Sequence, residues 1–509
     1  MNDFIPKTEP LAHQHETFLK TRDEEMWAYL LEMGLGKSKI TIDVMAWQFA
    51  RGLIDFAVIV APNGVHTNWI TDEIPKHMPD WTNCKYAEWS SQMKAAERQA
   101  VEAVFENASD RTSLRVIAIN IEAIGVQERY YKEKAGRFLR MILDNFSVFM
   151  VVDESSFIKT AGANRTRRLI TLGKQATSRR ILNGTPVTNG PLDLYSQYKF
   201  LAGNNPPLLG PYSLNKRSFD RHYAEWEEGM RRDGQRYPVL VGYRNLDELA
   251  EYVDACSTRR TKAECLDLPP KLYQKIPCEL HPEQAKRYKR VLDEGVLELK
   301  REGGEVSIDS VLTLWLRLQQ IVGGFVPTED PEDTESECIL DDYHDIPRVL
   351  EFARHIRQVH TGKIIIVCRF LAECKMWLDY FGEEAVSYIG KANYKDPDQR
   401  ERNKARFQGT EENDYKDDDP KVRILVMNKA GFRGHTFTKA CSVFFYSNSF
   451  SLDDRLQAED RPHRIGQDNA VNYFDGYAPG TVDVKIVDAY RMKKNLADVI
   501  TRDKPSTWV

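Results

Sequence analysis

Two sets of short apolar segments constrain the fold of this chain more than any other feature of its sequence. Each segment is a few residues long, and most are rich in Val, Ile and Phe, which is typical of strands buried on both faces of a parallel sheet. Segments of helical period separate them, for example 38–48 and 398–407. Strands that alternate with helices predict doubly wound α/β sheets. The first set lies at 26–31, 56–61, 114–119, 147–153 and 180–182, and the second at 363–368, 422–427 and 442–446.

The residues that separate the two sets have a different character. They contain long charged patterns of helical period at 282–302 and 310–322, together with polar segments that we expect to be loops. We therefore predict an α/β chain with two parallel-sheet lobes, a mostly helical insert and a short helical tail. The predicted boundaries are 1–202 for the N-terminal lobe, 203–345 for the insert and linker, 346–480 for the C-terminal lobe and 481–509 for a helical brace.

The composition and the start of the sequence argue against a membrane-spanning or secreted protein. No apolar run reaches the roughly 18–20 residues of a membrane-spanning helix, and the start, MNDFIPKTEP, lacks the layout of a secretory signal. Eight cysteines without a CxxC pair fit reduced thiols. We therefore expect an intracellular, cytoplasmic protein with no membrane partner. The net charge of −5 argues against a surface covered with nucleic-acid-binding charge, but it allows a local basic groove.

A phosphate-binding loop follows the first predicted strand. Residues 31–38 read LEMGLGKS and lead into a segment of helical period, which is the context that a P-loop requires. The glycines allow backbone N–H groups to surround phosphate oxygens, the lysine binds the β and γ phosphates, and the serine hydroxyl binds Mg²⁺. Leu31 departs from the pattern, which has a glycine there. The predicted ATP-binding residues of the loop are Met33, Gly34, Leu35, Gly36, Lys37 and Ser38.

A pair of carboxylates supplies the second half of an ATPase site. Asp153 and Glu154 end the apolar run VFMVVDE, so they are expected at the ligand-binding edge of the sheet. Asp153 can hold Mg²⁺ through water, and Glu154 can act as the general base that orients the attacking water. The alternative is a pair of acidic residues that caps a helix, and the P-loop upstream argues against it.

The remaining motifs resemble those of the Snf2 family, which belongs to helicase superfamily 2. The segment QAEDRPHRIGQ, at 457–467, closely resembles motif VI of that family. Other segments follow in the family's order, and the resemblance covers about 8–500. They are LAHQHETF (11–18), IVAPNGVHTNW (59–69), AINIEAI (118–124), DESSFIKT (153–160), LNGTPVTN (182–189), TRRTKAECLDLPPK (258–271), RLQQIVGGF (317–325), IIIVCRF (364–370) and MNKAGFRGHTF (427–437).

This resemblance implies RecA-like lobes, ATP and Mg²⁺ as cofactors, and roles for matching residues. Arg461 and Arg464 would be arginine fingers that reach the γ phosphate, a role that suits the planar guanidinium. Gln457 would couple the nucleotide state to lobe closure, and Gln14 would contact the adenine. Thr185 and Gly434 would link the ATP site to the DNA along which such proteins move.

The same resemblance implies that each lobe contacts a nucleic-acid backbone. Such contacts bind phosphates and carry little sequence information. Each candidate could also be an ordinary loop residue. By motif position, the candidates are Asn63, Asn68 and Asn120 in the first lobe, and Arg369, Asn428 and Lys429 in the second.

The sequence also departs from the family pattern. Ser155 and Ser156 replace the Ala-His pair that commonly follows Asp-Glu, and the histidine often links ATP to DNA. Phe432 and Arg433 replace a Gly-Leu pair in motif V. These departures indicate a divergent branch, and NLDELAEYV (245–253) resembles the annealing-helicase branch.

The expected function is that of an ATP-dependent double-stranded DNA translocase that remodels branched DNA by fork regression, branch migration or annealing. The short insert favours a compact, monomeric motor of bacterial or phage type. One alternative is a strand-separating DNA or RNA helicase of superfamily 2. The other is a non-catalytic DNA-binding scaffold, which the presence of all the ATPase residues argues against.

Overall fold

The computed structural model of the chain describes residues 4–107, 111–125, 134–230, 236–301, 308–327, 336–360, 362–390, 393, 394, 396, 398–410, 416–432 and 435–501. These residues form two compact units. The first contains 4–225, 241–267 and 495–501, and the second contains 226–240 and 268–494. The domain boundaries drawn from the sequence stay predictions.

The first unit is built on a seven-stranded sheet in which all neighbouring strands are parallel. The P-loop strand β1 lies two positions from β5, with β6 between them. The order is β3 (Lys85–Trp89), β4 (Arg115–Asn120), β2 (Phe56–Ala61), β5 (Val148–Asp153), β6 (Ser178–Leu182), β1 (Met26–Leu31) and β9 (Ser257–Arg260).

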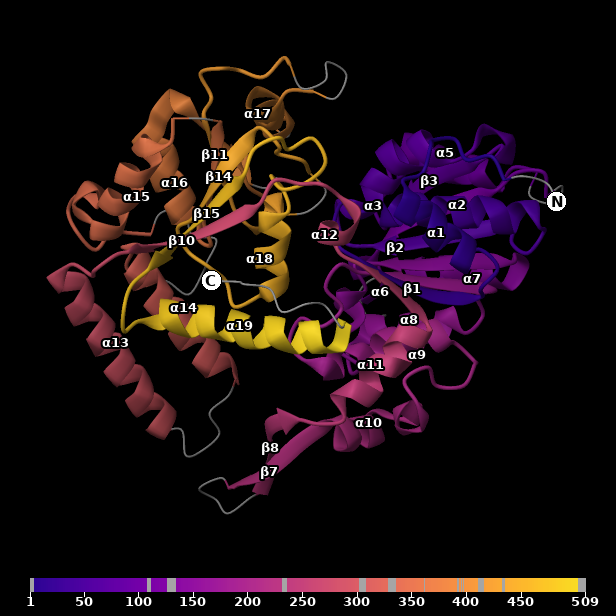
Figure 1. Cartoon of the computed structure of the whole chain (residues 1–509), viewed down its shortest axis with the longest axis horizontal. Helices are drawn as coiled ribbons and strands as arrows, with labels where there is room; N and C mark the ends of the chain where they lie inside the picture. The colour runs from indigo at the N-terminus through magenta and orange to yellow at the C-terminus, as the bar shows by residue number, and fades with distance from the viewer. Residues whose placement is uncertain are drawn as a thin grey trace. The chain divides into compact units, whose positions relative to one another are not determined.

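Helices cover both faces of this sheet (Figure 1). Alternate residues of β2 pack into different cores, since Val58 and Val60 join one cluster while Ile59 and Ala61 join the other. This alternation explains why the strand is apolar at every position. On one face lie α1 (Ala12–Thr21), α2 (Lys37–Ala50), α3 (Val65–Asn68) and α4 (Ile74–His77); on the other lie α5 (Ala95–Phe105), α7 (Lys134–Asn145), α8 (Asn164–Gly173) and α9 (Leu194–Ala202). The short helix α6 (Ile121–Gly125) follows β4.

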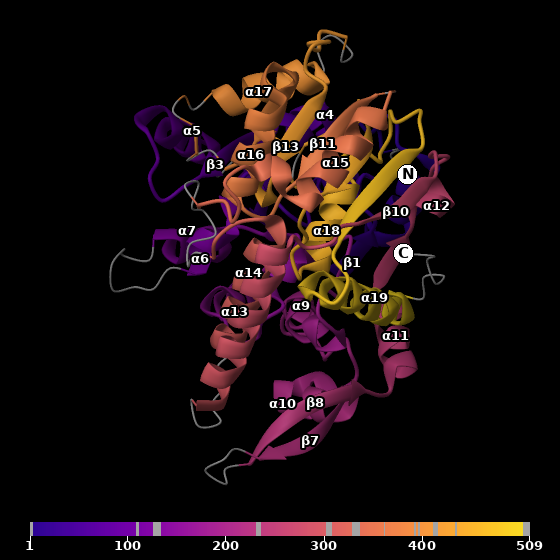
Figure 2. The ribbon, with the colours of Figure 1, turned by 90° about the vertical axis from the view of Figure 1, so that its left-hand side faces the viewer.

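The second unit has a six-stranded parallel sheet that is also covered on both faces. Ile364 and Ile366 pack on one side and Ile365 and Val367 on the other. Figure 2 shows α15 and α16 beside β11 and β13. The strand order is β10 (Lys271–Pro277), β15 (Val471–Tyr477), β14 (Ala440–Phe445), β11 (Lys363–Val367), β13 (Ile424–Met427) and β12 (Ala385–Tyr388). Its helices are α15 (Pro347–Gln358), α16 (Leu371–Phe381), α17 (Gln399–Gln408) and α18 (Leu452–Glu459).

The predicted fold class is confirmed, since both parallel sheets and the helical tail are present. The tail is α19 (Val482–Thr501), and α13 (Pro282–Arg301) lies beside α14 (Ile308–Gly323) in the insert (Figure 2). The insert also holds α10 (Lys216–Tyr223), α11 (Leu246–Ala255), α12 (Lys262–Cys265) and a two-stranded sheet of β7 (Ala224–Met230) and β8 (Arg236–Tyr243) that the sequence did not predict. No helix within the described ranges is long and apolar enough to cross a membrane.

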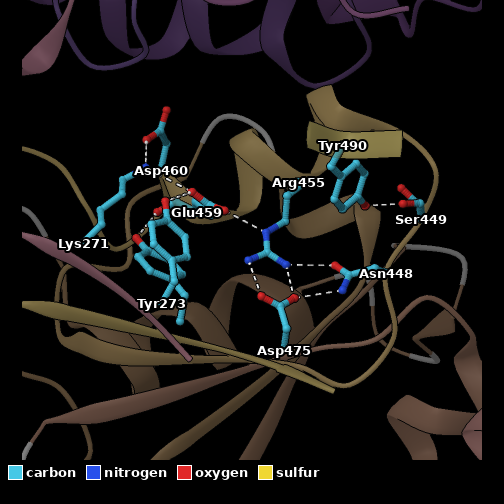
Figure 3. Close-up of polar contacts among 10 residues, drawn as sticks. Lys271, Tyr273, Asn448, Ser449, Arg455, Glu459, Asp460, Asp475 and Tyr490 are labelled. Carbon is cyan, nitrogen blue, oxygen red and sulfur yellow. Dashed lines mark hydrogen bonds and ion pairs between the residues drawn. The ribbon is translucent and has the colours of Figure 1, made fainter. Parts of the chain in front are cut away.

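A buried ionic network fixes α18 to the second sheet (Figure 3). The Arg455 guanidinium donates to both carboxylate oxygens of Asp475, one of them at 2.8 Å, and its Nε donates to Glu459 at 2.7 Å. Glu459 also accepts from the Tyr273 hydroxyl at 2.8 Å and pairs with Lys271 at 3.3 Å. These contacts join α18 to the adjacent strands β10 and β15. The chain continues from α18 directly into the predicted arginine fingers.

Candidate nucleotide site

The predicted site residues of the first unit gather at one edge of its sheet. The P-loop follows β1, Asn63 follows β2, Asp153 ends β5 and Thr185 follows β6, while Asn120 ends β4. Because the strands are parallel, their carboxyl ends meet at the same edge, which is where open α/β sheets bind ligands. The structure therefore brings these sequence-predicted residues together.

Backbone conformation shapes the P-loop. Gly34 and Gly36 have φ angles of 81° and 80°, in the left-handed region that glycine adopts without strain. A Cβ on Gly36 would lie 2.2 Å from Nε2 of Gln14. That amide donates to the Leu35 carbonyl at 3.3 Å, and the His13 ring contacts the same carbonyl at 2.9 Å. Gln14 is thus held against the loop, as its adenine-binding role requires, and that role stays a prediction.

The two polar residues of the P-loop lie at the start of α2. The Lys37 amine donates to the Leu31 carbonyl at 2.9 Å, so it folds over the loop that would surround a phosphate. Ser38 is half-buried in the first turn of the helix. Leu31, the departure from the motif, is the fully buried last residue of β1. The substitution therefore falls on the strand, where an apolar side chain packs, and the two glycines of the turn itself are kept.

Two hydrogen bonds hold the Asp153 carboxylate. Oδ1 accepts from the backbone N–H of Glu154 at 2.8 Å, and Oδ2 accepts from the indole Nε1 of Trp69 at 2.9 Å. Burial raises the pKa of Asp153, while the Trp69 hydrogen bond and the charge of Lys37 lower it. Glu154 has a φ of 49°, a strained conformation for a non-glycine residue that is common in active sites.

These groups fit a magnesium ion. A serine hydroxyl and a carboxylate are hard oxygen donors, and Mg²⁺ is commonly held by one or two protein groups, water and substrate phosphates. The burial that raises the pKa of Asp153 also disfavours its ionised form, and a divalent cation would offset this. Ser38 and Asp153 are therefore the residues that would hold the ion.

Ser155, one of the departures from the family pattern, joins two strand ends. Its hydroxyl donates to Oε1 of Gln197 at 2.6 Å and accepts from Nδ2 of Asn183 at 3.3 Å. The Gln197 amide in turn donates to the carbonyls of Pro186 and Asp193, both at 2.9 Å. Asn183 Oδ1 accepts from the Thr185 backbone at 2.8 Å. The segment after β5 is thus bonded to the predicted motif III.

In the second unit, the predicted motifs V and VI are bonded together. Arg461 Nε donates to the Gln457 carbonyl at 3.0 Å and its guanidinium donates to the His435 carbonyl at 2.8 Å. Arg464 donates to the same carbonyl at 3.2 Å and to the Thr436 hydroxyl at 2.9 Å. Arg461 is buried and Arg464 is half-exposed. Gln457 is fully buried, and its Oε1 accepts no hydrogen bond from the described part of the chain.

The predicted DNA contacts have varied surroundings, and their role stays a prediction. Asn63 is exposed and Asn68 and Asn120 are half-buried. Arg369 donates to the side chain of Gln319, the buried Asn428 caps a turn by accepting from Ala430 at 3.1 Å, and the exposed Lys429 pairs with Asp454 at 3.0 Å. Gly434 and Arg433 lie outside the described residues.

Several contacts of the site were not predicted from the sequence. Trp69 ended a recognised motif, but nothing local indicated its partner Asp153, which is 84 positions away. Gln197 and His13 carried no signal. The basic residues Arg179 and Arg180 of β6 are buried and donate to backbone carbonyls of α1, α8 and α9 and their flanks.

Comparisons with known protein families identify the family of this chain. Residues 18–323 match the SNF2-related domain, and 346–466 match the helicase conserved C-terminal domain. The chain belongs to the SNF2-related family. The predicted family is therefore confirmed, and with it the predicted class of enzyme, a nucleic-acid-dependent ATPase.

Individual relatives are distant. The human DNA annealing helicase and endonuclease ZRANB3 is 25% identical over 89% of this chain and 36% of its own length. The yeast TATA-binding protein-associated factor MOT1 is 26% identical over 70% of this chain and 20% of its own. This chain therefore spans about a third or less of these two relatives. The Sulfolobus solfataricus SWI2/SNF2 ATPase core in complex with dsDNA is 21% identical, with a TM-score of 0.40 over 99% of this chain and 95% of that one.

Proposed function

We propose that the chain is an ATP-dependent double-stranded DNA translocase of the Snf2 type that remodels branched DNA. The carrying observation is the convergence of the P-loop, Asp153-Glu154 and the loops after β2 and β6 at one sheet edge. ATP hydrolysis and DNA contact would thus share one rigid scaffold. The similarity to DNA annealing helicases supports DNA as the track. DNA as the track also makes an intracellular location part of this proposal.

The proposed chemistry follows from the residues. The P-loop amides and Lys37 bind the phosphates, and Gln14 contacts the base. Ser38 and Asp153 would hold magnesium, which when bound would supply positive charge beside the phosphates. Glu154 orients the attacking water and receives its proton.

The second sheet would complete the reaction. Arg464, with Arg461 beside it, would approach the transferring phosphoryl group when the lobes close, so that hydrolysis depends on closure. The buried Oε1 of Gln457 accepts no hydrogen bond from the described residues. It would gain a hydrogen-bond donor when the lobes close around ATP. Contacts of Asn63, Asn68, Asn120, Arg369, Asn428 and Lys429 to backbone phosphates would convert closure into steps.

The choice of track is testable by stimulation of the ATPase. We expect linear duplex and forked DNA to raise kcat at least tenfold over the DNA-free rate, and RNA to have little effect. The measurement is steady-state phosphate release with duplex, single-stranded and forked DNA and with RNA, and Glu154→Gln and Lys37→Ala variants serve as inactive controls. Stimulation by single strands alone, together with unwinding of an overhang duplex, would indicate the strand-separating helicase instead.

The hydrogen bonds of Ser155 predict a coupling role for Gln197. Replacement of Gln197 by methionine removes the acceptor of the Ser155 hydroxyl and the donor to two loop carbonyls. We expect duplex-stimulated kcat to fall about tenfold, since residues that couple two sites typically contribute 0.5–2 kcal/mol. ATP affinity, measured with a fluorescent analogue, should change little. An unaltered duplex response would show that these hydrogen bonds serve stability alone.

A further inference from the structure

The hydrogen bond between Trp69 and Asp153 joins two parts of the first unit that the proposed mechanism assigns to different tasks. Asp153 belongs to the proposed metal site, whereas Trp69 directly follows Asn68 in the segment after β2 that is expected to contact DNA. Both side chains are buried, with Trp69 only 1% exposed. The indole N–H has one direction in which to donate, and in the structure it points at Oδ2 of Asp153.

The segment around Trp69 has an unusual helical geometry. The short helix α3 runs into a π-helical turn at Trp69–Glu73, which leads into α4. Such turns are rare and often occur at functional sites. His66 in α3 ties this segment to the end of β2 and to β3, since its ring contacts the Pro62 carbonyl at 3.2 Å and lies 2.9 Å from the Glu88 carboxylate. A displacement of the exposed end of this segment would therefore reach the indole through continuous helical backbone.

We propose that Trp69 is a positioning residue that transmits DNA contact at the loop after β2 to the metal-binding carboxylate. Oδ1 of Asp153 accepts from the backbone N–H of Glu154, and Oδ2 accepts from the Trp69 indole. The position of the indole therefore influences how the carboxylate is rotated about its Cβ–Cγ bond. When a DNA phosphate draws the α3 segment toward itself, the indole moves and the carboxylate turns. The affinity for magnesium in the nucleotide complex therefore depends on DNA. This inference rests on the proposed function.

The test replaces Trp69 by phenylalanine, which keeps an aromatic ring in the core but removes the N–H donor. The readout is the Mg²⁺ concentration at half-maximal binding of a fluorescent, non-hydrolysable ATP analogue, with and without a linear duplex. In the unmodified protein, we expect duplex to lower this midpoint about tenfold. In Trp69→Phe, we expect duplex to leave the midpoint unchanged, while analogue binding in EDTA and duplex affinity match those of the unmodified protein.

Trp377→Phe is the matched control. Trp377 is also fully buried, but its indole Nε1 donates to none of the described residues, so the same substitution removes no hydrogen bond. A second variant, Trp69→His, keeps an N–H donor on a smaller ring and should recover part of the duplex response.

The outcomes separate this inference from the proposed function. If duplex lowers the Mg²⁺ midpoint of Trp69→Phe as much as that of the unmodified protein, the inference is overturned and the translocase proposal stands. If no DNA changes the midpoint or the ATPase rate of the unmodified protein, both are overturned. If Trp377→Phe loses the response as well, the effect reflects core packing and the inference fails.

Discussion

Replacement of Arg464 by alanine should lower the duplex-stimulated kcat by about 10³-fold, because arginine fingers contribute about 10³–10⁵ to phosphoryl transfer. In the structure, Arg464 is half-exposed, and its guanidinium donates to the His435 carbonyl and the Thr436 hydroxyl. Because both acceptors are only partly buried, water can replace the guanidinium at them, and the guanidinium can bind a phosphate instead. The variant should therefore fold normally and bind the ATP analogue with nearly unchanged affinity. Single-turnover phosphate release measures the effect on chemistry.

Arg461 provides the contrast. It is buried, and it donates to the carbonyls of Gln457 and His435, so Arg461→Ala removes two hydrogen bonds of a buried side chain and should lower the melting temperature. Arg464→Lys keeps the charge but loses the planar fork and should recover only part of the rate. If Arg464→Ala retains the rate within threefold while Arg461→Ala remains folded and inactive, the finger is Arg461 instead.

The sequence predicted those parts of the structure that depend on local pattern. Strand β2 was predicted at its observed bounds because every residue is apolar and packs into one of two cores. The P-loop was predictable because its chemistry needs glycines, a lysine and a hydroxyl in consecutive positions. Strands β3 and β10 were missed because their burial alternates and polar residues interrupt the apolar pattern.

Contacts between distant positions were not predictable in the same way. The partner of Trp69 is 84 positions away and the partner of Ser155 is 42 positions away, so neither pair leaves a periodic signal in one sequence. The departure at Ser155 raised the question of how ATP and DNA are coupled. Only the three-dimensional arrangement supplies Asn183 and Gln197 as its partners.

The second large expected effect is on stability. Replacement of Arg455 by methionine should destabilise the second unit by about 3–5 kcal/mol, because removal of one partner leaves buried charges uncompensated. Although burial alone lowers the pKa of Arg455, the charges of Asp475 and Glu459 raise it, so the guanidinium stays charged. Its loss takes the cationic partner from Asp475 and one of two cationic partners from Glu459, which keeps Lys271. It also removes the guanidinium that lies 3.6 Å from the centroid of the Phe445 ring. The measurement is the urea midpoint followed by circular dichroism.

A double variant distinguishes the network from simple packing. Arg455→Met combined with Asp475→Leu removes a charge pair together, so it should recover much of the loss, as buried pairs replaced by apolar residues often do. Arg354→Met, which removes an exposed pair with Glu351, is the control and should change stability by less than about 1 kcal/mol. Because α18 leads directly to Arg461 and Arg464, a folded Arg455→Met protein should also lose kcat with little change in ATP affinity. An Arg455→Met protein as stable as the unmodified chain would contradict the view that this network fixes α18.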